Sequence, residues 1–512
     1  MLFNSHEFLF VFLPVVFMGF VVLARRAPWA SPIWLALGSV FFYGWLSREM
    51  TVLLLASILF NYVGGRVVDH ARCNGAYLRG KVGVIVVANL ALLGYFKYAN
   101  FFVDTINKLG GSIDLISIAL PMGISFFTFT QIAYVVDVSK GNRGERSFVN
   151  YLLFVTWFPH LVAGPVLHHK QMMPQFHEMA SGKSRFSAET VSVGLSMFSM
   201  GLFKKVVLAD NIAVFANPAF DAAAAGQAPM MVEAWVALLA YSLQLYFDFS
   251  GYSDMAIGLS RMFGVRLPLN FDSPYKATSI VDFWRRWHMT LSSFLRDYLY
   301  IPLGGNRNGE PRRYLNLFLT MVLGGLWHGA SWNFVIWGGL HGLYLVINNF
   351  WSRIFAPRFN FAGIISRGLF ASVTFFAVVL AWVPFRSADF STAMSMWSGL
   401  FGLNGVALPT RLEPWVPEVL KSSVRFQQMY IGDGLSFSEA VLSVFCGLIC
   451  VWFFPNSQQW LAAYRPAWES VQARIAWWSW RPTRGYAVAM GVLLAASILA
   501  FKKNSPFLYF QF

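Results

Sequence analysis

The sequence has few charged residues. Asp, Glu, Lys and Arg make up 12% of its 512 residues, and 57% of the residues are hydrophobic. Ordinary soluble domains carry about 25% charged residues. The shortage of charge therefore excludes an ordinary soluble protein and indicates an all-α, polytopic membrane protein, because helices satisfy their own backbone polar groups in lipid. The length suits one large helical bundle, a single domain over residues 1–512.

Cysteine is scarce as well, and its positions predict no cross-link. The three cysteines are Cys73, Cys446 and Cys450. Cys446 and Cys450 lie four residues apart in an apolar stretch, where helix packing is the expected role. We expect no disulfide.

The sequence also lacks the signatures of soluble enzymes. It has no P-loop, no Gly-x-Ser-x-Gly, no HExxH and no dinucleotide fingerprint. His160, His168 and His169 lie close together in the chain, but no Cys or carboxylate lies at ligand spacing. We therefore expect no metal site.

Acidic residues are outnumbered, which gives a net charge of +15 from 39 basic and 24 acidic residues. The basic residues lie in short loops between apolar segments, a pattern that follows from membrane topology. We expect the lipid bilayer, and not nucleic acid, as the partner of this charge.

Apolar segments occur along the whole chain and predict about 11 membrane crossings, each of about 20 residues at most. The first segment has no Lys or Arg before it and Arg25 and Arg26 after it, so it is expected to be retained with the N-terminus outside. Lys502 and Lys503 predict a cytoplasmic C-terminus. The segments are 8–24, 31–46, 51–64, 82–98, 115–136, 149–163, 189–209, 231–249, 368–384, 436–454 and 486–501.

Three regions depart from this simple pattern. Residues 154–170 are broken by proline and glycine and predict a re-entrant or interfacial element. Asp248 and Asp254 lie among Gly and Ser at the end of an apolar segment, where local capping and turn formation is the expected role. Residues 402–435 are predicted to be a loop.

Residues 279–332 hold two histidines, each directly after a tryptophan. Ser279 and Asp282 predict the capped start of an amphipathic helix. This helix would continue to Tyr298 with His288 on its apolar face and Arg285 on another. An Arg-bearing helix with a Trp-rich face is typical of a membrane interface.

Residues 314–352 contain no Asp, Glu, Lys or Arg, which is enough for about two membrane crossings. A helix starting near Tyr314 would place His328 about 20 Å along its axis. Gly324, Gly325 and Gly329 leave room for a close-packed neighbour or a ligand. A histidine at membrane depth indicates a functional site, and the alternative is a packed histidine bonded to a backbone carbonyl.

A neutral imidazole in an apolar pocket can act as general base toward a hydroxyl group. The phosphates of a coenzyme A thioester would match the basic residues Arg285, Arg286, Arg307, Arg312 and Arg313. From the residues alone, acyl transfer and transport both remain open.

Seven motifs resemble the membrane-bound O-acyltransferase family, in the branch of alginate O-acetylation proteins and their cellulose-acetylating relatives. They cover nearly the whole chain, with the core between residues 94 and 332, and leave residues 402–435 unmatched. They are GYFKYANFF (94–102), LPMGISFFTF (120–129), FPHLVAGPV (158–166), QLYFDFSGYSDMAIGL (244–259), DFWRRWHMTLSSFLRDYLYIPLGGNR (282–307), LGGLWHGASW (323–332) and PFLYFQF (506–512).

The resemblance implies a multi-helix bundle in the bacterial inner membrane, with a tunnel through it and the catalytic histidines at His328 and His288. It implies acetyl-CoA as a cytoplasmic donor substrate, no permanently bound cofactor, and a separate periplasmic acetyltransferase that modifies an exopolysaccharide. Within the family, D-alanyl transfer to a cell-wall polymer is the alternative. Outside it, the alternative is a non-catalytic transporter or export channel.

Overall fold

The computed structural model divides into two compact units. The first unit comprises Met1–Leu202, Tyr252–Leu269 and Ser457–Phe510, and the second comprises Phe203–Gly251, Asn270–Asn456 and Gln511–Phe512. Lys502, Lys503 and most of the C-terminal motif lie outside the described residues. The prediction of a single domain stays a prediction. The described residues are 1–75, 77–162, 164–183, 186–354, 363–427, 429–431, 435–471, 479–501 and 507–508.

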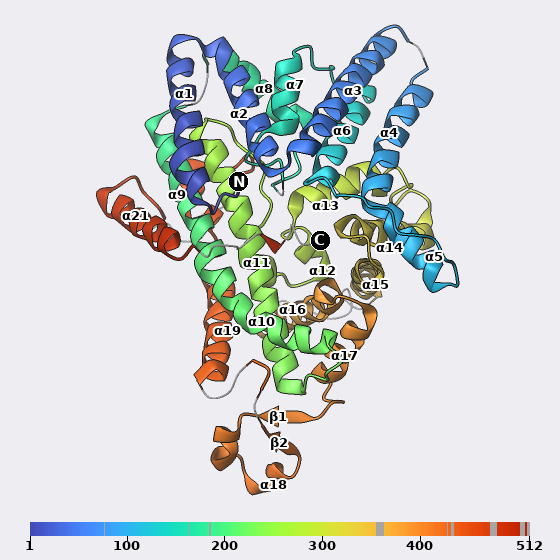
Figure 1. Ribbon diagram of the computed structural model, residues 1–512, viewed down its shortest axis with the longest axis vertical. Helices are drawn as coiled ribbons and strands as arrows, with labels where there is room; N and C mark the ends of the chain where they lie inside the picture. Colours follow the sequence, from blue (N-terminus) through green and yellow to red (C-terminus); the bar gives the residue numbers. More distant parts are fainter. Residues whose placement is uncertain are drawn as a thin grey trace. The chain divides into compact units, whose positions relative to one another are not determined.

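The first unit consists of packed helices (Figure 1). Helix α2 (Ser31–Leu46) packs against α7 (Phe148–Thr156), while α3 (Arg48–Cys73) and α4 (Arg79–Leu93) both pack against α6 (Ile124–Ser139). The other main helices of this unit are η1 (Phe8–Phe12), α1 (Leu13–Arg26), η3 (Gly94–Tyr98), α5 (Ala99–Lys108), α8 (His169–Ala180), α9 (Ala188–Phe203), α20 (Ser457–Trp460) and α21 (Arg484–Leu499).

The second unit carries the two histidines of interest. Its centre is a hairpin of α14 (Gly309–His328) and α15 (Trp332–Ile354), against which α12 (Ile280–Trp284) and α16 (Ile364–Arg386) pack. Helix α11 (Met231–Met262) begins in this unit and ends in the first. The other main elements are η4 (Lys204–Ala209), α10 (Asp210–Ala224), η5 (Pro274–Lys276), α13 (Met289–Leu295), η6 (Arg296–Tyr300), α17 (Phe390–Leu400), β1 (Val406–Leu408), η7 (Thr410–Trp415), α18 (Glu418–Lys421), β2 (Val424–Phe426) and α19 (Leu435–Phe453).

Glycines allow α14 and α15 to pack closely, as the sequence led us to expect. A Cβ atom on Gly325 would collide with the carbonyl oxygen of Phe334, and one on Gly338 would collide with that of Met321. Small residues of this kind let helix backbones approach each other. Along the hairpin, Gly325 lies opposite Phe334, Met321 opposite Gly338, Phe318 opposite Gly342 and Arg313 opposite Asn349.

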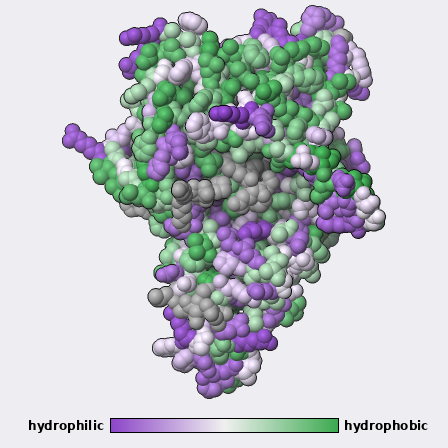
Figure 2. Space-filling model, in the orientation of Figure 1, coloured by the Kyte–Doolittle hydropathy of each residue, from purple (hydrophilic) through white to green (hydrophobic). Residues whose placement is uncertain are grey.

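Several helices expose apolar side chains. On the first helix Phe10 is 60% exposed, Met18 69% and Val22 51%, and Figure 2 shows hydrophobic side chains over α1, α2 and α3. Such surfaces indicate contact with lipid. Six helices among the described residues are long and apolar enough to cross a membrane: Phe8–Arg26, Arg48–Cys73, Arg79–Lys108, Ala188–Ala224, Ile365–Arg386 and Ser436–Phe453.

The predicted all-α, multi-span membrane fold is confirmed by these helices. The predicted number of about 11 crossings stays a prediction. Helices α14 and α15, which we expected to be two crossings, are long enough but are not among the six. Their glycine and polar residues lower the mean hydropathy that such a crossing requires.

The prediction of one amphipathic helix from Ser279 to Tyr298 is wrong in its middle. Ser279 does cap a helix, since its hydroxyl accepts a hydrogen bond from the Asp282 backbone N–H. However, this helix ends at Trp284 and α13 begins only at Met289. The backbone between them bonds instead to residues 270–272: the Arg286 carbonyl accepts from Asp272 N–H (2.9 Å), and Met289 N–H donates to the Asn270 carbonyl (3.0 Å).

The turn predicted around Asp248 and Asp254 is also wrong, because α11 runs through both residues without a break. Both carboxylates are buried and bond to other elements. Lys205 Nζ lies 2.7 Å from Asp248 and 2.8 Å from Asp210. In the first unit, the Ser457 hydroxyl and the Gln458 amide donate to Asp254. Long-range pairing thus replaces the local caps that the sequence suggested.

Two segment boundaries need smaller corrections. The apolar segment 115–136 is helical only from Ile124, because Gly123 has a φ of 72° and interrupts the backbone before the helix. Residues 402–435 are not only a loop: where the structure describes them, β1 and β2 form a parallel pair with Val406 opposite Val424. Hydrophilic and hydrophobic side chains are mixed around this small sheet (Figure 2), and Trp415 and Val419 are among the exposed hydrophobic ones.

Candidate active site

His288 is fully buried and is held by a hydrogen bond to Asn270. Its Nδ1 lies 3.0 Å from Asn270 Oδ1, and that oxygen also accepts from the Thr290 hydroxyl (2.9 Å) and the Thr290 backbone N–H (3.4 Å). Because a backbone N–H can only donate, the Asn270 atom must be its carbonyl oxygen. His288 Nδ1 therefore carries a proton, and the neutral ring keeps its lone pair on Nε2. Among the described residues no group bonds to this Nε2.

The backbone at His288 is strained. Its φ of 44° lies in the left-handed region, which few residues other than glycine adopt. Strain of this kind costs about 1–3 kcal/mol and concentrates at functional sites. The sequence could not reveal it, because it depends on the bonds to residues 270–272 described above.

His328 is the last residue of α14 and is almost fully buried in aromatic rings. Its ring centre lies 5.0 Å from those of Trp327 and Trp337 and 5.4 Å from that of Phe385. The ring of His288 is 6.2 Å away. The structure thus brings together the two histidines predicted as catalytic, within reach of one small substrate group.

A third histidine, His341, belongs to the same aromatic cluster and was not predicted. It is 0% exposed, and its ring centre lies 4.9 Å from that of Trp337, which in turn contacts His328. Trp337 and His341 are four residues apart, so they share one face of α15. This spacing is the signal that could have found it.

The five predicted donor-binding arginines do not form one group. Arg285 and Arg286 lie beside His288 in the chain, whereas Arg312 and Arg313 lie near the start of α14, about 22–24 Å from its His328 end by helix length, and Arg307 lies just before this helix. Two of these arginines already bind other side chains: Arg286 forms an ion pair with Asp282 (2.8 Å), and Arg313 donates a hydrogen bond to Asn349 (2.6 Å). Arg285, Arg307 and Arg312 are exposed.

The remaining polar groups of interest lie in the first unit. The His160 Nε2 atom faces the Phe154 carbonyl oxygen at 3.1 Å, as a packed histidine would. Within the described part of the chain, no three His, Cys, Asp or Glu side chains lie close enough together to hold a metal ion.

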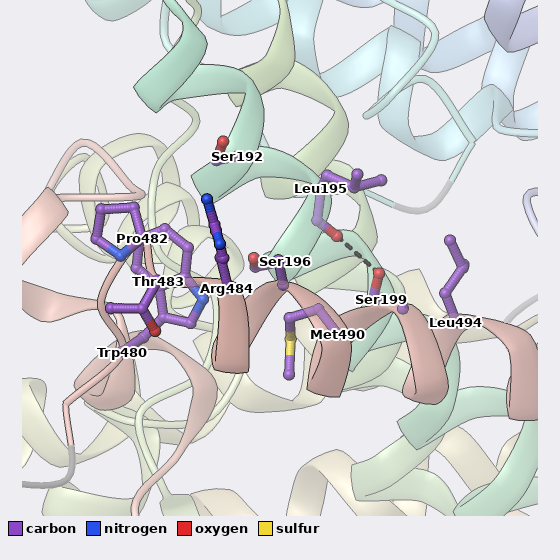
Figure 3. A pocket seen from close by; sticks show the side chains of 12 residues that line it. Ser192, Leu195, Ser196, Ser199, Trp480, Pro482, Thr483, Arg484, Met490 and Leu494 are labelled. Atoms are coloured by element: carbon purple, nitrogen blue, oxygen red, sulfur yellow. Dashed lines mark hydrogen bonds between the residues drawn. The ribbon is translucent and has the colours of Figure 1, made fainter.

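A groove of about 400 Å³ lies between α9 and α21 in the first unit (Figure 3). Ser192, Ser196 and Arg484 lie toward one end of it, and Leu195 and Leu494 lie at the other. None of the seven residues predicted from the sequence lines this groove.

The histidine pair has the properties of a general base. Asn270 fixes the tautomer of His288, the aromatic rings exclude water around His328, and a neutral imidazole in such surroundings accepts a proton from a hydroxyl group. The fold and the site together define a polytopic membrane protein with a buried pair of histidines among its helices.

Comparison with known proteins identifies the family. Residues 130–385 match MBOAT, the membrane-bound O-acyltransferase family, and the chain belongs to this family. A peptidoglycan O-acetyltransferase of Helicobacter pylori is 44% identical over 436 residues, which is 80% of this chain and 81% of that protein. The probable alginate O-acetylase AlgI of Pseudomonas aeruginosa is 37% identical over 539 residues, 100% of both chains.

A more distant relative is named for a different activity. The teichoic acid D-alanyltransferase of Streptococcus thermophilus is 29% identical over 240 residues, 45% of this chain and 57% of that protein. The predicted family and the predicted enzyme class are both confirmed: the protein is a membrane-bound O-acyltransferase.

Replacing His288 with alanine is expected to lower acyl transfer by about 10²-fold or more, the usual contribution of a group that moves a proton. Asn270→Ala should cost less, because the imidazole remains while its tautomer is no longer fixed. Initial rates at matched protein level would measure both. His169→Ala removes another buried imidazole and serves as control. A near-normal rate for His288→Ala would show that His288 only packs.

Proposed function

We propose that the protein transfers acetyl groups from cytoplasmic acetyl-CoA toward the hydroxyl groups of a cell-surface polysaccharide, of the alginate or cellulose type. The observation that carries the proposal is the match to the alginate O-acetylase over the full length of both chains. The buried pair His288 and His328 supplies the chemistry. The peptidoglycan O-acetyltransferase match makes peptidoglycan the second candidate polymer.

In the proposed reaction His328 takes the proton of the acceptor hydroxyl, with His288 held beside it by Asn270. The hydroxyl oxygen then attacks the thioester carbonyl carbon, and a new C–O bond forms. The C–S bond breaks, and the coenzyme A thiolate leaves and takes up the proton from the imidazolium. No further co-reactant is needed, and no cofactor stays bound.

The acceptor is proposed to be the serine of a separate periplasmic acetyltransferase, which then modifies the polymer. The chain would lie in the bacterial inner membrane with its N-terminus in the periplasm and its C-terminus in the cytoplasm. The basic loops after the first apolar helices support this orientation. A fixed tunnel with openings on both faces of the membrane would let the acetyl group pass without the alternating-access conformational change that a transporter needs.

One alternative within the family is testable, and the alternative outside it no longer stands. Transfer of D-alanyl from a carrier protein is favoured by the match to the teichoic acid D-alanyltransferase, but that match covers 45% of this chain. The non-catalytic export channel considered from the sequence is excluded by the membership of an acyltransferase family, and transport would not require the fixed tautomer of the buried His288.

The experiment that tests the proposal is donor use by purified protein. We expect coenzyme A release from acetyl-CoA in the presence of the partner or polymer, and no activity with a D-alanyl carrier protein. A deletion strain should produce polymer that lacks acetyl groups. Activity with the D-alanyl carrier alone would replace the proposed donor, and activity with neither would mean that the protein transfers another acyl group.

Exposed arginines are expected to contribute to donor binding. Arg307 and Arg312 have no ion-pair partner among the described residues and are free to meet phosphates. Changing each to glutamine should raise the KM for acetyl-CoA about three- to tenfold and leave kcat nearly unchanged, as uniform binding contacts do. Arg313→Gln, which breaks the bond to Asn349, is the comparison for a structural effect. An unchanged KM for all single and paired variants would leave these residues a topological role only.

A further inference from the structure

His341 and two tryptophans beside it carry buried polar atoms that the proposed reaction does not use. His341 is 0% exposed, Trp337 1% and Trp284 9%. Among the described residues, no hydrogen-bond partner meets either ring nitrogen of His341 or the indole Nε1 of either tryptophan. Buried polar groups are rarely left unpaired, because each then costs the free energy of a lost hydrogen bond.

These three side chains touch one another. The ring centre of His341 lies 4.9 Å from that of Trp337 and 5.1 Å from that of Trp284, and the two tryptophan rings lie 5.9 Å apart. A neutral histidine supplies one N–H donor and one acceptor nitrogen, and each indole supplies one donor. The cluster therefore offers three donors and one acceptor within one small region.

The position of the cluster along the hairpin suggests its ligand. Arg313 lies opposite Asn349 near one end of α15, and His328 contacts Trp337 near the other. At about 1.5 Å per residue, His341 lies about 12 Å from Asn349 and about 6 Å from Trp337 along the axis. The unpaired nitrogens thus lie between the arginines that would hold phosphates and the histidine that would meet the thioester.

We propose that His341, Trp337 and Trp284 form a subsite for the amide-bearing arm of the acyl thioester donor. This arm joins the phosphates of coenzyme A to its sulfur, and each of its amides carries a carbonyl acceptor and an N–H donor. The three N–H donors bind carbonyl oxygens of the arm, and the remaining imidazole nitrogen accepts an amide N–H. The inference rests on the proposed donor, and it assigns these residues to binding and positioning, not to proton transfer.

The test compares two donors on purified full-length protein: acetyl-CoA, and an acetyl thioester of a simple alkyl thiol, which has no amide. His341→Phe and Trp337→Phe keep an aromatic ring and remove the nitrogen atoms. We expect each variant to raise the KM for acetyl-CoA about three- to tenfold, the usual effect of one neutral hydrogen bond. The KM for the alkyl thioester should stay within about twofold of wild type, because that donor makes no bond to the subsite.

Trp235→Phe is the matched control, because the Trp235 indole already donates to the Leu400 carbonyl oxygen (3.0 Å). It should leave both KM values unchanged. The unfolding temperature separates damage from lost binding: replacing an unpaired buried group with an apolar ring should leave it equal or higher. If His341→Phe does not fold, Trp337→Phe decides the question.

The outcomes separate this inference from the proposed function. Equal losses with both donors, or no loss with either, would overturn the subsite while leaving acetyl-CoA as donor. The second of these results would mean that ring contacts or water satisfy the nitrogens. If wild-type protein does not use acetyl-CoA at all, the proposed donor is wrong, and the subsite proposed for that donor is wrong as well.

Discussion

Replacing His328 with alanine is expected to lower acyl transfer by about 10²–10⁴-fold, the range over which a positioned general base contributes. The side chain lies in a shell of aromatic rings, with the rings of Trp327 and Trp337 at 5.0 Å and that of His288 at 6.2 Å. Water has little access to replace it there. The residue ends α14, and alanine is favourable in a helix, so the protein should still reach the membrane.

The measurement is the acetyl content of the polymer in cells that express wild type or His328→Ala at equal protein level. His328→Gln keeps the polar volume but cannot take the proton, and it should be as inactive as alanine. If either variant retained wild-type acetylation, His328 would not be the base. His288, whose Nε2 bonds to no group among the described residues, would then take that role.

Replacing Lys205 with alanine is expected to destabilise the second unit by about 3–5 kcal/mol, the cost of breaking a buried ion pair from one side. Lys205 is 2% exposed and Asp248 3%, and Asp210 is the other carboxylate within 2.8 Å. Without the ammonium group, the buried carboxylate of Asp248 and the partly buried carboxylate of Asp210 would lose the cation that they share. Lys205→Ala with Asp248→Leu should be less destabilised than Lys205→Ala alone.

Unfolding by a denaturing detergent would measure these variants. Lys108→Ala is the control, because its ion pair with Asp104 has the same 2.7 Å length but is largely exposed. An exposed pair of this kind contributes about 0.3–0.5 kcal/mol. If Lys205→Ala and Lys108→Ala unfolded at the same detergent concentration, the buried pair would not stabilise the fold.

Much of the fold could be predicted from the sequence because apolar periodicity is a local property. The segments 368–384, 436–454 and 486–501 correspond to α16, α19 and α21 within a few residues. The Ser279 cap was predictable for the same reason: its hydroxyl bonds three residues ahead, to Asp282. Signals of this kind need no knowledge of the rest of the chain.

The features that failed depend on partners distant in sequence. The predicted helix is interrupted around His288 because the backbone there forms hydrogen bonds to Asn270 and Asp272. Helical periodicity cannot reveal such long-range bonds. Likewise, Asp248 sits among residues typical of a turn, yet it stays helical because Lys205 pairs with it. Polar residues in apolar surroundings were therefore the least predictable.

The candidate site was predicted in part. His288 and His328 were expected to act together, and their rings are near each other. The five arginines were expected at one opening, but the length of α14 separates them into two groups. His341 was missed because a histidine in an apolar helix usually packs. Its four-residue spacing from Trp337 was the available sequence signal, and among the described residues neither of its ring nitrogens has a hydrogen-bond partner.

The proposed topology and the cytoplasmic entry of the donor are tested most directly by the accessibility of the two ends of α14 to a reagent that cannot cross the membrane. Arg307 precedes this helix and Ser331 follows it. Cysteines at these positions, in a protein whose three native cysteines Cys73, Cys446 and Cys450 are changed to serine, can be tested with an impermeant thiol reagent. We expect Arg307→Cys to label only in inverted vesicles and Ser331→Cys only from outside. Labelling of the Arg307 position in intact cells would contradict both the topology and the cytoplasmic entry of the donor.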